Sequence, residues 1–384
     1  MASASRLTST TSLPSIAIIG GGVIGLSIGW RLRQAGCAVT IFERGETGHG
    51  ASWAAAGMLA AGIEAEPTEE KLFELGRYSQ SLWPGFAAEL EEAAGIGIGY
   101  DATGTLVCAF TRDQAEKLRR GIEFQSRLGG EFEWLGGRAA REIEPALSAN
   151  LVAAVLSRHD HQVENRLVTT ALDIAFRRAG GIVKHGEASL DIAGGRVRGV
   201  VIGEMHHPAD VTVLAAGAWS RLVPGLPPDA MPPIRPVKGQ MLALAMPPGA
   251  PLIRHIVWGA QCYLVPRADG RLLVGATTEE RGFDSAITAG GMLGLLDDAW
   301  RTLPGIEDLP ICESWTGHRP GSPDDMPILG PCPVEGLVLA TGHHRNGFLL
   351  TPATAALIAD YILSSRADAR LAPFQLDRFG SAGT

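Results

Sequence analysis

A short stretch near the beginning of the chain constrains its fold more than any other. Residues 15–19 (SIAII) form an apolar run that suits a strand buried on both faces. The run leads directly into the GxGxxG pattern GGGVIG at residues 20–25. A helix-like stretch over 26–34 follows, and a second predicted strand covers 38–42. These elements form one βαβ unit, so the sequence predicts an α/β fold that begins with a parallel sheet.

The residue types in this unit predict a dinucleotide site. Gly20, Gly22 and Gly25 permit a tight turn, a close approach of backbone to pyrophosphate, and close packing of helix on strand. The helix N-terminus would offer N–H groups and a positive dipole end to the phosphates. Glu43 ends the second strand and can accept hydrogen bonds from a ribose.

Composition argues against several other classes. The 384 residues carry a formal net charge of −8 without a basic stripe, which disfavours a nucleic-acid partner. The five cysteines never occur as CxxC, and the adjacent histidine pairs have no cysteine or carboxylate at metal-ligand spacing beside them. His159 and His161 flank Asp160, a pattern that we interpret as a solvated loop, so we expect no metal and a reducing, cytoplasmic location. Residues 7–30 are uncharged but interrupted by Pro14 and five glycines, so we expect no stable membrane association. Residues 1–13, rich in Ser and Thr, are expected to be a disordered leader.

Later segments help to choose between FAD and NAD. A long loop of small residues over 44–58 follows Glu43, where an NAD-binding domain would proceed promptly to its next helix. Two apolar strands, 211–215 and 337–341, each run into a glycine, which lets backbone come close to a cofactor. A helix-like run over 351–363 follows the second strand.

These residues carry a family resemblance. The matching segments are IAIIGGGVIGLSIGWRL, SWAAAGMLA, PVKGQ, CYLVPR with GRLLVGAT, GHRPGSPDDMPILG and TGHHRNGFLLTPATAALIADYI. They extend from residue 16 to about residue 363. The chain resembles the D-amino-acid oxidase superfamily of FAD-dependent oxidoreductases and, within it, the glycine oxidases of the thiamine pathway.

The resemblance implies a mixed α/β, two-domain fold of the p-hydroxybenzoate hydroxylase type. A Rossmann-like FAD-binding domain is expected over 14–85, 146–230 and 310–384, and a substrate-binding domain with an antiparallel sheet over 86–145 and 231–309.

Three further elements follow from the residues themselves. Residues 262–267 and 271–277 are predicted to form a hairpin, and 290–303 an amphipathic helix. The proline-rich stretch 223–236 is interpreted as a crossover between the domains.

An amino-acid oxidase must grip a carboxylate, and arginine does this with two parallel hydrogen bonds. Arg319 lies in GHRPG, between Gly317 and Pro320, which we interpret as a rigid turn. Arg345 follows a strand that ends in glycine. By resemblance, Arg319 binds the substrate carboxylate, Tyr263 shares it, and Arg345 is a second active-site arginine.

The resemblance also implies a set of cofactor contacts. They are expected from Gly20, Gly22, Gly25, Glu43, Arg44, Ser52, Ala55, Gly57, Met58, Gly217, Gly342, Arg345, Asn346, Gly347 and Leu349. The related monomeric sarcosine oxidases attach flavin through a cysteine near the position of Gly317. This chain has no cysteine between Cys312 and Cys332, so non-covalent FAD is expected.

The implied activity is oxidative deamination of glycine, other small amines and D-amino acids, by hydride transfer from Cα to flavin N5. The products would be the α-keto acid (glyoxylate from glycine), ammonia and H2O2, with glycine imine supplied to thiamine thiazole synthesis. A homotetramer is expected by resemblance. Gln261, Thr278 and His344 depart from the family pattern along the pocket wall, so the ranking of glycine, sarcosine and small D-amino acids stays open.

Two other functions also stay open. A dehydrogenase of the same superfamily would pass electrons to a quinone or carrier instead of O2. A non-catalytic FAD-binding module would have no use for the carboxylate-binding residues Arg319 and Tyr263.

Overall fold

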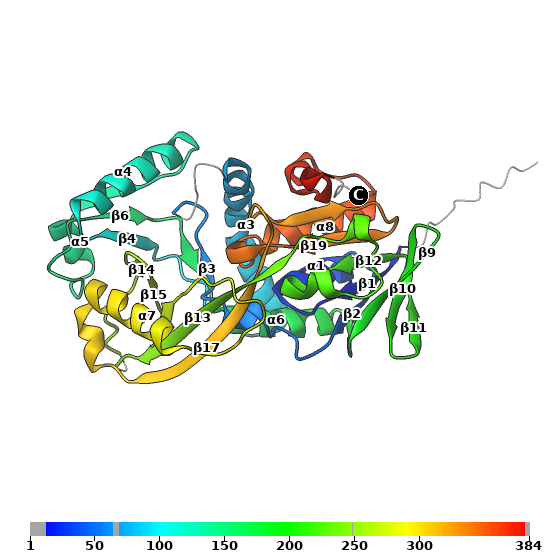
Figure 1. Cartoon of the computed structure of the whole chain (residues 1–384), viewed down its shortest axis with the longest axis horizontal. Coiled ribbons are helices and arrows are strands. Elements are labelled where there is room, and N and C mark those ends of the chain that lie inside the picture. Colours follow the sequence, from blue (N-terminus) through cyan, green and yellow to red (C-terminus); the bar gives the residue numbers. More distant parts are fainter. Residues whose placement is uncertain (1–12, 64–68, 248, 381–384) are drawn as a thin grey trace, which may run out of the picture.

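The computed structural model describes residues 13–63, 69–247 and 249–380. It contains two large β-sheets, a six-stranded one in the right half of Figure 1 and an eight-stranded one in the left half. The predicted mixed α/β fold with two such units is confirmed. The predicted leader lies outside the described residues, apart from Leu13, which is exposed.

The six-stranded sheet contains the βαβ unit that the sequence predicts. In spatial order its strands are β18 (Ile328–Pro331), β19 (Leu337–Thr341), β12 (Val211–Leu214), β1 (Ser15–Ile19), β2 (Ala38–Glu43) and β8 (Ile182–His185). Neighbouring strands are parallel, except that β18 runs antiparallel to β19.

The central strand β1 is apolar from Ile16 to Ile19 because both of its faces are covered. Ile16 and Ile18 belong to the core beneath α1 (Val23–Gln34), whereas Ala17 and Ile19 belong to a core on the opposite face. A strand buried on both faces reads as a continuous apolar run rather than as an alternation.

Three further helices and a small sheet complete this half of the molecule. Helix α1 packs against α6 (Asn165–Arg178) and α8 (Thr351–Ser364), and α3 (Glu70–Ala94) packs against the latter two. The small antiparallel sheet consists of β9 (Ala188–Ala193), β10 (Arg196–Ile202) and β11 (Met205–Pro208).

The eight-stranded sheet carries the predicted hairpin. In spatial order its strands are β17 (Ile311–Gly321), β13 (Arg235–Ala245), β16 (Arg271–Gly275), β15 (Tyr263–Pro266), β14 (Ile256–Trp258), β4 (Thr105–Ala109), β6 (Ala153–Ser157) and β5 (Glu133–Gly136). Its pairs are antiparallel except for β14 with β4. The hairpin of β15 and β16 is confirmed.

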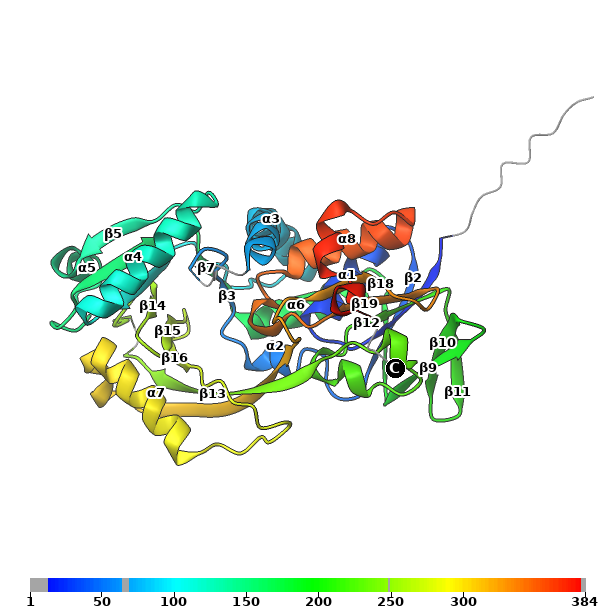
Figure 2. The same ribbon diagram turned by 45° about the horizontal axis from the view of Figure 1, so that its top comes forward.

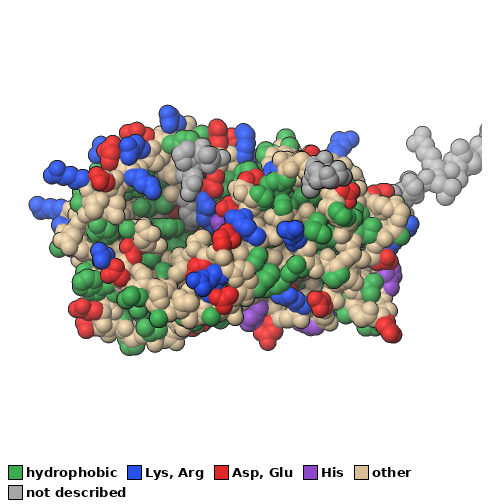
Figure 3. All heavy atoms as spheres, in the orientation of Figure 1, with side chains coloured by type: hydrophobic (Ala, Val, Ile, Leu, Met, Phe, Trp, Pro, Cys, Tyr) green, Lys and Arg blue, Asp and Glu red, His purple; other side chains and the backbone are tan. Residues whose placement is uncertain are grey.

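Helices accompany this sheet too. They are α4 (Arg112–Arg127), α5 (Gly137–Ile143) and α7 (Ala289–Thr302). The last of these confirms the amphipathic helix expected over 290–303. Within the described part of the chain, no helix combines the length and apolar character needed to cross a membrane. Acidic and basic side chains are interspersed on the face shown in Figure 3.

The longest strands of the second sheet reach the first. Strands β13 and β17 run toward the six-stranded sheet in both ribbon views (Figures 1 and 2). Both contact the 3-10 helix η1 (Gly217–Leu222), and β17 also contacts α2 (Ala51–Ala54). The short strands β3 (Met58–Leu59) and β7 (His161–Gln162) pair with each other.

Two local expectations differ from the structure. The interpretation of GHRPG as a rigid turn is wrong, because Arg319 lies inside β17, which pairs with β13 over its length. The boundary expected at 85/86 falls inside α3, and β6 and β17 pair within the eight-stranded sheet although the expected ranges placed them with FAD. The division into two domains therefore stays a proposal, and we propose that it follows sheet membership.

Candidate active site

A cavity of ≈ 970 Å³ lies between the two sheets. Its wall includes the glycine turn between β1 and α1, the end of β2, residues 49–52 and 54–58, and η1. On the other side it is lined from β13, β15 and β17, and at one end by the 3-10 helix η4 (His344–Asn346). The two halves of the fold therefore contribute residues to one site.

The glycine turn needs its glycines for different reasons. Gly20 has a φ of +109°, and a Cβ there would lie 2.3 Å from the Ala215 carbonyl oxygen. A Cβ on Gly25 would lie 1.9 Å from the Gly20 carbonyl oxygen, so this glycine lets α1 approach the turn. Gly22 and the first residues of α1 line the cavity.

Glu43 lies at the end of β2 and also lines the cavity. Its two carboxylate oxygens accept hydrogen bonds from the Gly21 N–H (2.7 Å) and the Gly45 N–H (2.9 Å). These bonds hold the carboxylate beside the turn, where its remaining lone pairs can accept further hydrogen bonds. Ser52 Oγ accepts a hydrogen bond of 3.0 Å from the Val23 N–H at the start of α1.

The predicted substrate residues lie on the opposite wall. Tyr263 begins β15 with 9% of its surface exposed, and Arg319 is half-buried in β17. Arg319 donates a hydrogen bond of 3.1 Å to the Thr277 carbonyl, and within the described residues it forms no ion pair. A guanidinium in this state keeps donors for an incoming carboxylate.

Two glycines make room for these side chains, and sequence reasoning did not single them out. A Cβ on Gly239 would lie 2.6 Å from an Arg319 guanidinium nitrogen, and a Cβ on Gly275 would lie 2.8 Å from the Tyr263 hydroxyl. Gly239 lies diagonally across the β13–β17 ladder from Arg319, a relation visible only once the register is known. The PVKGQ segment was noted for its resemblance, without a role for its glycine.

Arg345 also lines the cavity, from η4. One of its guanidinium nitrogens lies 2.7 Å from Glu69 Oε2, and the Glu69 side chain is 11% exposed. Arg345 is therefore already engaged by a carboxylate of the protein, unlike Arg319. Its predicted contacts with substrate and cofactor stay predictions.

Two adjacent histidines before Arg345 line the cavity as well. His343 is fully buried next to Thr354 Oγ1 at 3.1 Å, and burial lowers the pKa of its imidazole to about 3. Burial also lowers the pKa of His344 to about 4, with Arg319 and Arg345 acting in the same direction and Asp325 opposing them. Both imidazoles are therefore neutral at pH 7.

Most of the predicted site residues lie on this one cavity. Those that line it are Gly20, Gly22, Glu43, Arg44, Ser52, Ala55, Gly57, Met58, Gly217, Tyr263, Arg319, Arg345 and Gly347. Gly25, Gly342, Asn346 and Leu349 lie outside its lining. Leu349 has its carbonyl engaged by Ser79 Oγ and Trp83 Nε1.

The residues present fit FAD. The cavity joins a glycine turn, a helix N-terminus and the Glu43 carboxylate, which can accept hydrogen bonds from a ribose, to a wall of small residues, Ala54–Gly57. None of its described lining residues is a cysteine, and non-covalent binding stays a prediction. Among the described residues no cluster of His, Cys, Asp and Glu could hold a metal ion.

Fold and cavity together are those of an FAD-dependent oxidoreductase. A family model described as FAD dependent oxidoreductase matches residues 15–361, and the chain belongs to this family.

Similar proteins include glycine oxidase from Geobacillus kaustophilus, which is 38% identical over 369 residues, covering 94% of this chain and 96% of the relative. The crystal structure of glycine oxidase from that organism superposes with a TM-score of 0.88 at 37% identity, covering 96% and 99% of the two chains. The bifunctional protein ThiO/ThiG of Trichormus variabilis is 37% identical over 95% of this chain, which spans 55% of that relative's length.

Proposed function

We propose that this protein is an FAD-dependent oxidase of glycine and other small amines, with sarcosine and small D-amino acids as further candidate substrates. O2 accepts the two electrons and water hydrolyses the imine, so the products are H2O2, the α-keto acid (glyoxylate from glycine) and ammonia, or methylamine when the substrate is sarcosine. The observation that carries the proposal is that Arg319 and Tyr263 line the same cavity as the glycine turn and Glu43.

The chain's own residues supply binding and orientation. Arg319 grips the substrate carboxylate, and Tyr263 shares it from the neighbouring region of the sheet. This grip presents the substrate Cα–H to the cofactor in a fixed direction, which is a positioning contribution to the rate. When FAD is bound, it supplies the two-electron acceptor for that bond, and O2 takes the electrons onward.

The groups around the proposed carboxylate site affect its net charge. His344 is neutral at pH 7 because burial and the two nearby arginines disfavour its charged form. Arg319 therefore presents the positive charge on its side of the cavity, and Arg345 is neutralised by Glu69. A substrate with one carboxylate fits this arrangement.

The names of similar proteins support a place in thiamine biosynthesis. ThiO/ThiG proteins join a region similar to this chain to a second region of comparable length. We propose that glycine imine formed here is supplied to thiazole synthesis. A homotetramer and a cytoplasmic location are part of this proposal, the latter supported by five free cysteines. Sedimentation velocity of the holoprotein tests the tetramer.

A peroxide-coupled screen over glycine, sarcosine and small D-amino acids tests the activity. Arg319→Ala should raise KM and lower kcat/KM by about 100-fold, the size expected when charge-assisted hydrogen bonds are lost. Arg301→Ala, an exposed arginine of α7, is the control. Unchanged kcat/KM in the Arg319 variant would remove that residue from the site.

Two further measurements separate the alternatives. Dye reduction under argon without peroxide formation in air would indicate a dehydrogenase. Flavin that no amino acid bleaches anaerobically would indicate a non-catalytic FAD-binding module.

A further inference from the structure

The small-residue wall of the cavity is held in place by side chains that come from elsewhere. This wall segment, residues 51–58, comprises α2 and the turn into β3, and most of its residues line the cavity. Apart from Trp53 and Met58 its residues are small, so its position depends largely on what binds its backbone.

Arg267, at the turn after β15, binds this backbone directly. One guanidinium nitrogen donates to the Ala56 carbonyl at 2.6 Å, and the other donates to the Val163 carbonyl at 2.8 Å. The Val163 N–H in turn donates to the Gly57 carbonyl at 2.9 Å. The Arg267 side chain is only 4% exposed, so these hydrogen bonds are made away from water.

Two other side chains complete the hold on the wall segment. Trp315 Nε1, from β17, donates to the Ala54 carbonyl at 2.9 Å. Asn165 Nδ2, at the start of α6, donates to the carbonyls of Ser52 and Trp53, both at 2.9 Å. Side chains of other elements thus bind the carbonyls of Ser52, Trp53, Ala54 and Ala56.

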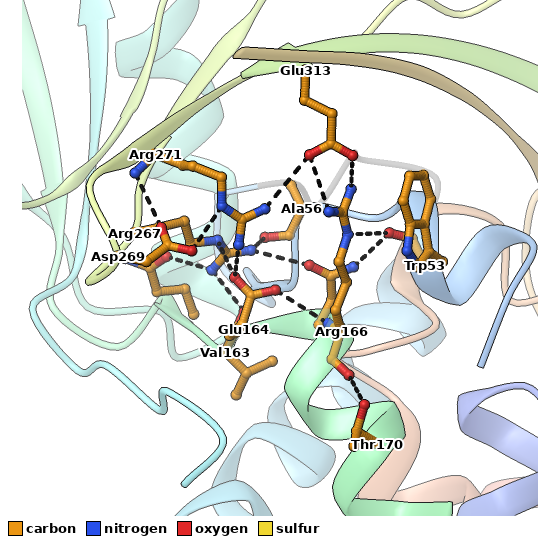
Figure 4. A network of polar contacts seen from close by, with 12 residues as sticks. Trp53, Ala56, Val163, Glu164, Arg166, Thr170, Arg267, Asp269, Arg271 and Glu313 are labelled. Atoms are coloured by element: carbon orange, nitrogen blue, oxygen red, sulfur yellow. Dashed lines mark hydrogen bonds and ion pairs between the residues drawn. The ribbon is translucent and has the colours of Figure 1, made fainter. Parts of the chain in front are cut away.

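An ion-pair network keeps Arg267 in this position. Its Nε lies 3.2 Å from Glu164 Oε2, and Arg271 binds the same carboxylate at 3.1 Å. Arg166 binds Glu313 through both of its terminal nitrogens, at 3.0 and 2.8 Å, and stacks on the Trp53 ring. Figure 4 shows these groups converging on Ala56 and Trp53 from β15–β16, β17 and α6.

The binding side chains lie near the substrate residues in the chain. Arg267 directly follows β15, the strand that Tyr263 begins, and Trp315 is four residues before Arg319 on β17. Because residues an even number of positions apart on a strand share a face, Trp315 and Arg319 lie on the same face of β17. Close approach is possible because Gly317 lies between them, where a Cβ would lie 2.4 Å from Ala54 Cβ.

We propose that Arg267 and Trp315 are positioning residues that set the distance between the FAD-side wall segment and the substrate residues Tyr263 and Arg319. Arg267 donates a hydrogen bond to the Ala56 carbonyl, and Trp315 donates one to the Ala54 carbonyl, so each links the sheet that carries Tyr263 and Arg319 to the wall segment. The inference rests on the proposed function for the identity of the substrate, but not for the contacts themselves.

Arg267→Lys tests this proposal, because lysine keeps the charge but cannot reach two carbonyls with one planar fork. Arg33→Lys is the matched control, since Arg33 also donates to two backbone carbonyls, those of Ala179 and Cys37, but lies outside the cavity lining and away from the ion-pair network of Arg267. We expect Arg267→Lys to lower the rate of anaerobic flavin reduction by amino acid 10- to 100-fold, roughly the loss seen when an outer positioning contact is removed. The KM should change less than kcat, and the visible flavin spectrum should shift.

A second variant and a second readout distinguish an effect on positioning from an effect on folding. Trp315→Phe removes the donor to Ala54 while keeping an aromatic ring, and it should show the same separation of kcat from KM. Thermal unfolding and FAD titration of the apoprotein are recorded for every variant.

The proposal is overturned if Arg267→Lys and Trp315→Phe match the control in reduction rate and flavin spectrum. It is also overturned if Arg267→Lys fails to fold and Trp315→Phe matches wild type. If wild-type flavin is reduced by no amino acid, the proposed function fails, and the flavin spectra and FAD affinities of the variants still decide this inference.

Discussion

The proposed substrate site depends on glycines as well as on charged side chains, because the glycines leave space that those side chains occupy. Gly239 and Gly275 are the positions where the guanidinium of Arg319 and the hydroxyl of Tyr263 occupy space that a Cβ would take. An arginine that must meet a carboxylate in a fixed orientation is sensitive to such neighbours, because a small displacement breaks both of its parallel hydrogen bonds.

Gly239→Ala should therefore displace Arg319 and raise KM for the amino acid about 10-fold, with FAD affinity unchanged. The reason is that the added Cβ would lie 2.6 Å from the guanidinium. Steady-state kinetics and FAD titration measure the two effects. Gly294→Ala in α7, where a Cβ meets nothing within 4 Å, is the control. Equal KM in both variants would contradict the argument.

His343 provides a pH-dependent prediction. Burial lowers its folded-state pKa to about 3, against about 6.5 in an unfolded chain. Between these values the unfolded state binds more protons, so stability falls as pH is lowered through this window. The contribution of His343 is fully present above pH 6.5.

His343→Gln should remove this contribution. As the pH is lowered from 6 to 4, the free energy of unfolding of the wild type should fall more steeply than that of the variant. The difference in slope should approach about 1.4 kcal/mol per pH unit. Urea unfolding of both proteins at several pH values, with FAD in excess, provides the difference. Parallel stability curves over that range would show that His343 does not titrate as its burial implies.

At the scale of elements, the βαβ unit was predictable because its information is local. Strand, turn, helix and strand follow one another within residues 15–43, and their periodicities suffice to place them. The strand β17 was misread because Gly317, Pro320 and Gly321 normally mark turns. Strand β17 lies at the edge of its sheet, where a proline without an N–H is tolerated. Pairing with β13 keeps the backbone extended through these residues.

Gly25→Ala should weaken the βαβ unit as an element. Its Cβ would lie 1.9 Å from the Gly20 carbonyl oxygen, so α1 must move away from the turn. We expect a loss of about 1–3 kcal/mol of stability, the usual cost of overpacking, together with weaker FAD binding. Thermal unfolding and FAD titration measure both.

The control for this variant is Gly85→Ala in α3, where a Cβ meets nothing within 4 Å. In a helix interior this change should be neutral or stabilising by about 0.5–1 kcal/mol. A Gly25 variant as stable as the Gly85 variant would mean that the turn accommodates the methyl group.

For the whole molecule, the central fact is that one cavity is shared by two sheets. A ligand that fills it contacts both halves and stabilises the folded state by mass action. Removing FAD should therefore lower the thermal midpoint, by the equivalent of about 2.7 kcal/mol when FAD was present at 100 times its Kd. Calorimetry of the apoprotein and of the protein with added FAD measures this.

Acid precipitation of the holoprotein tests the mode of attachment. All yellow colour should pass into the supernatant, because the cavity lining includes no described cysteine. Flavin retained in the pellet would contradict non-covalent binding, and a thermal midpoint unaffected by FAD would mean that the folded protein does not bind FAD at that concentration.

The sequence by itself determined the dinucleotide unit and the two apolar strands that run into glycine, because these depend on local order and residue type. Arg319 and Arg345 stood out by their setting in the chain, whereas Tyr263 was named through the family resemblance. Only the tertiary structure decided that Gly239 clears space for Arg319, that Glu69 occupies Arg345, and that Arg267 holds Ala56. Each of these relations joins residues that are distant in the chain, and it arises from strand register and packing, which local sequence does not specify.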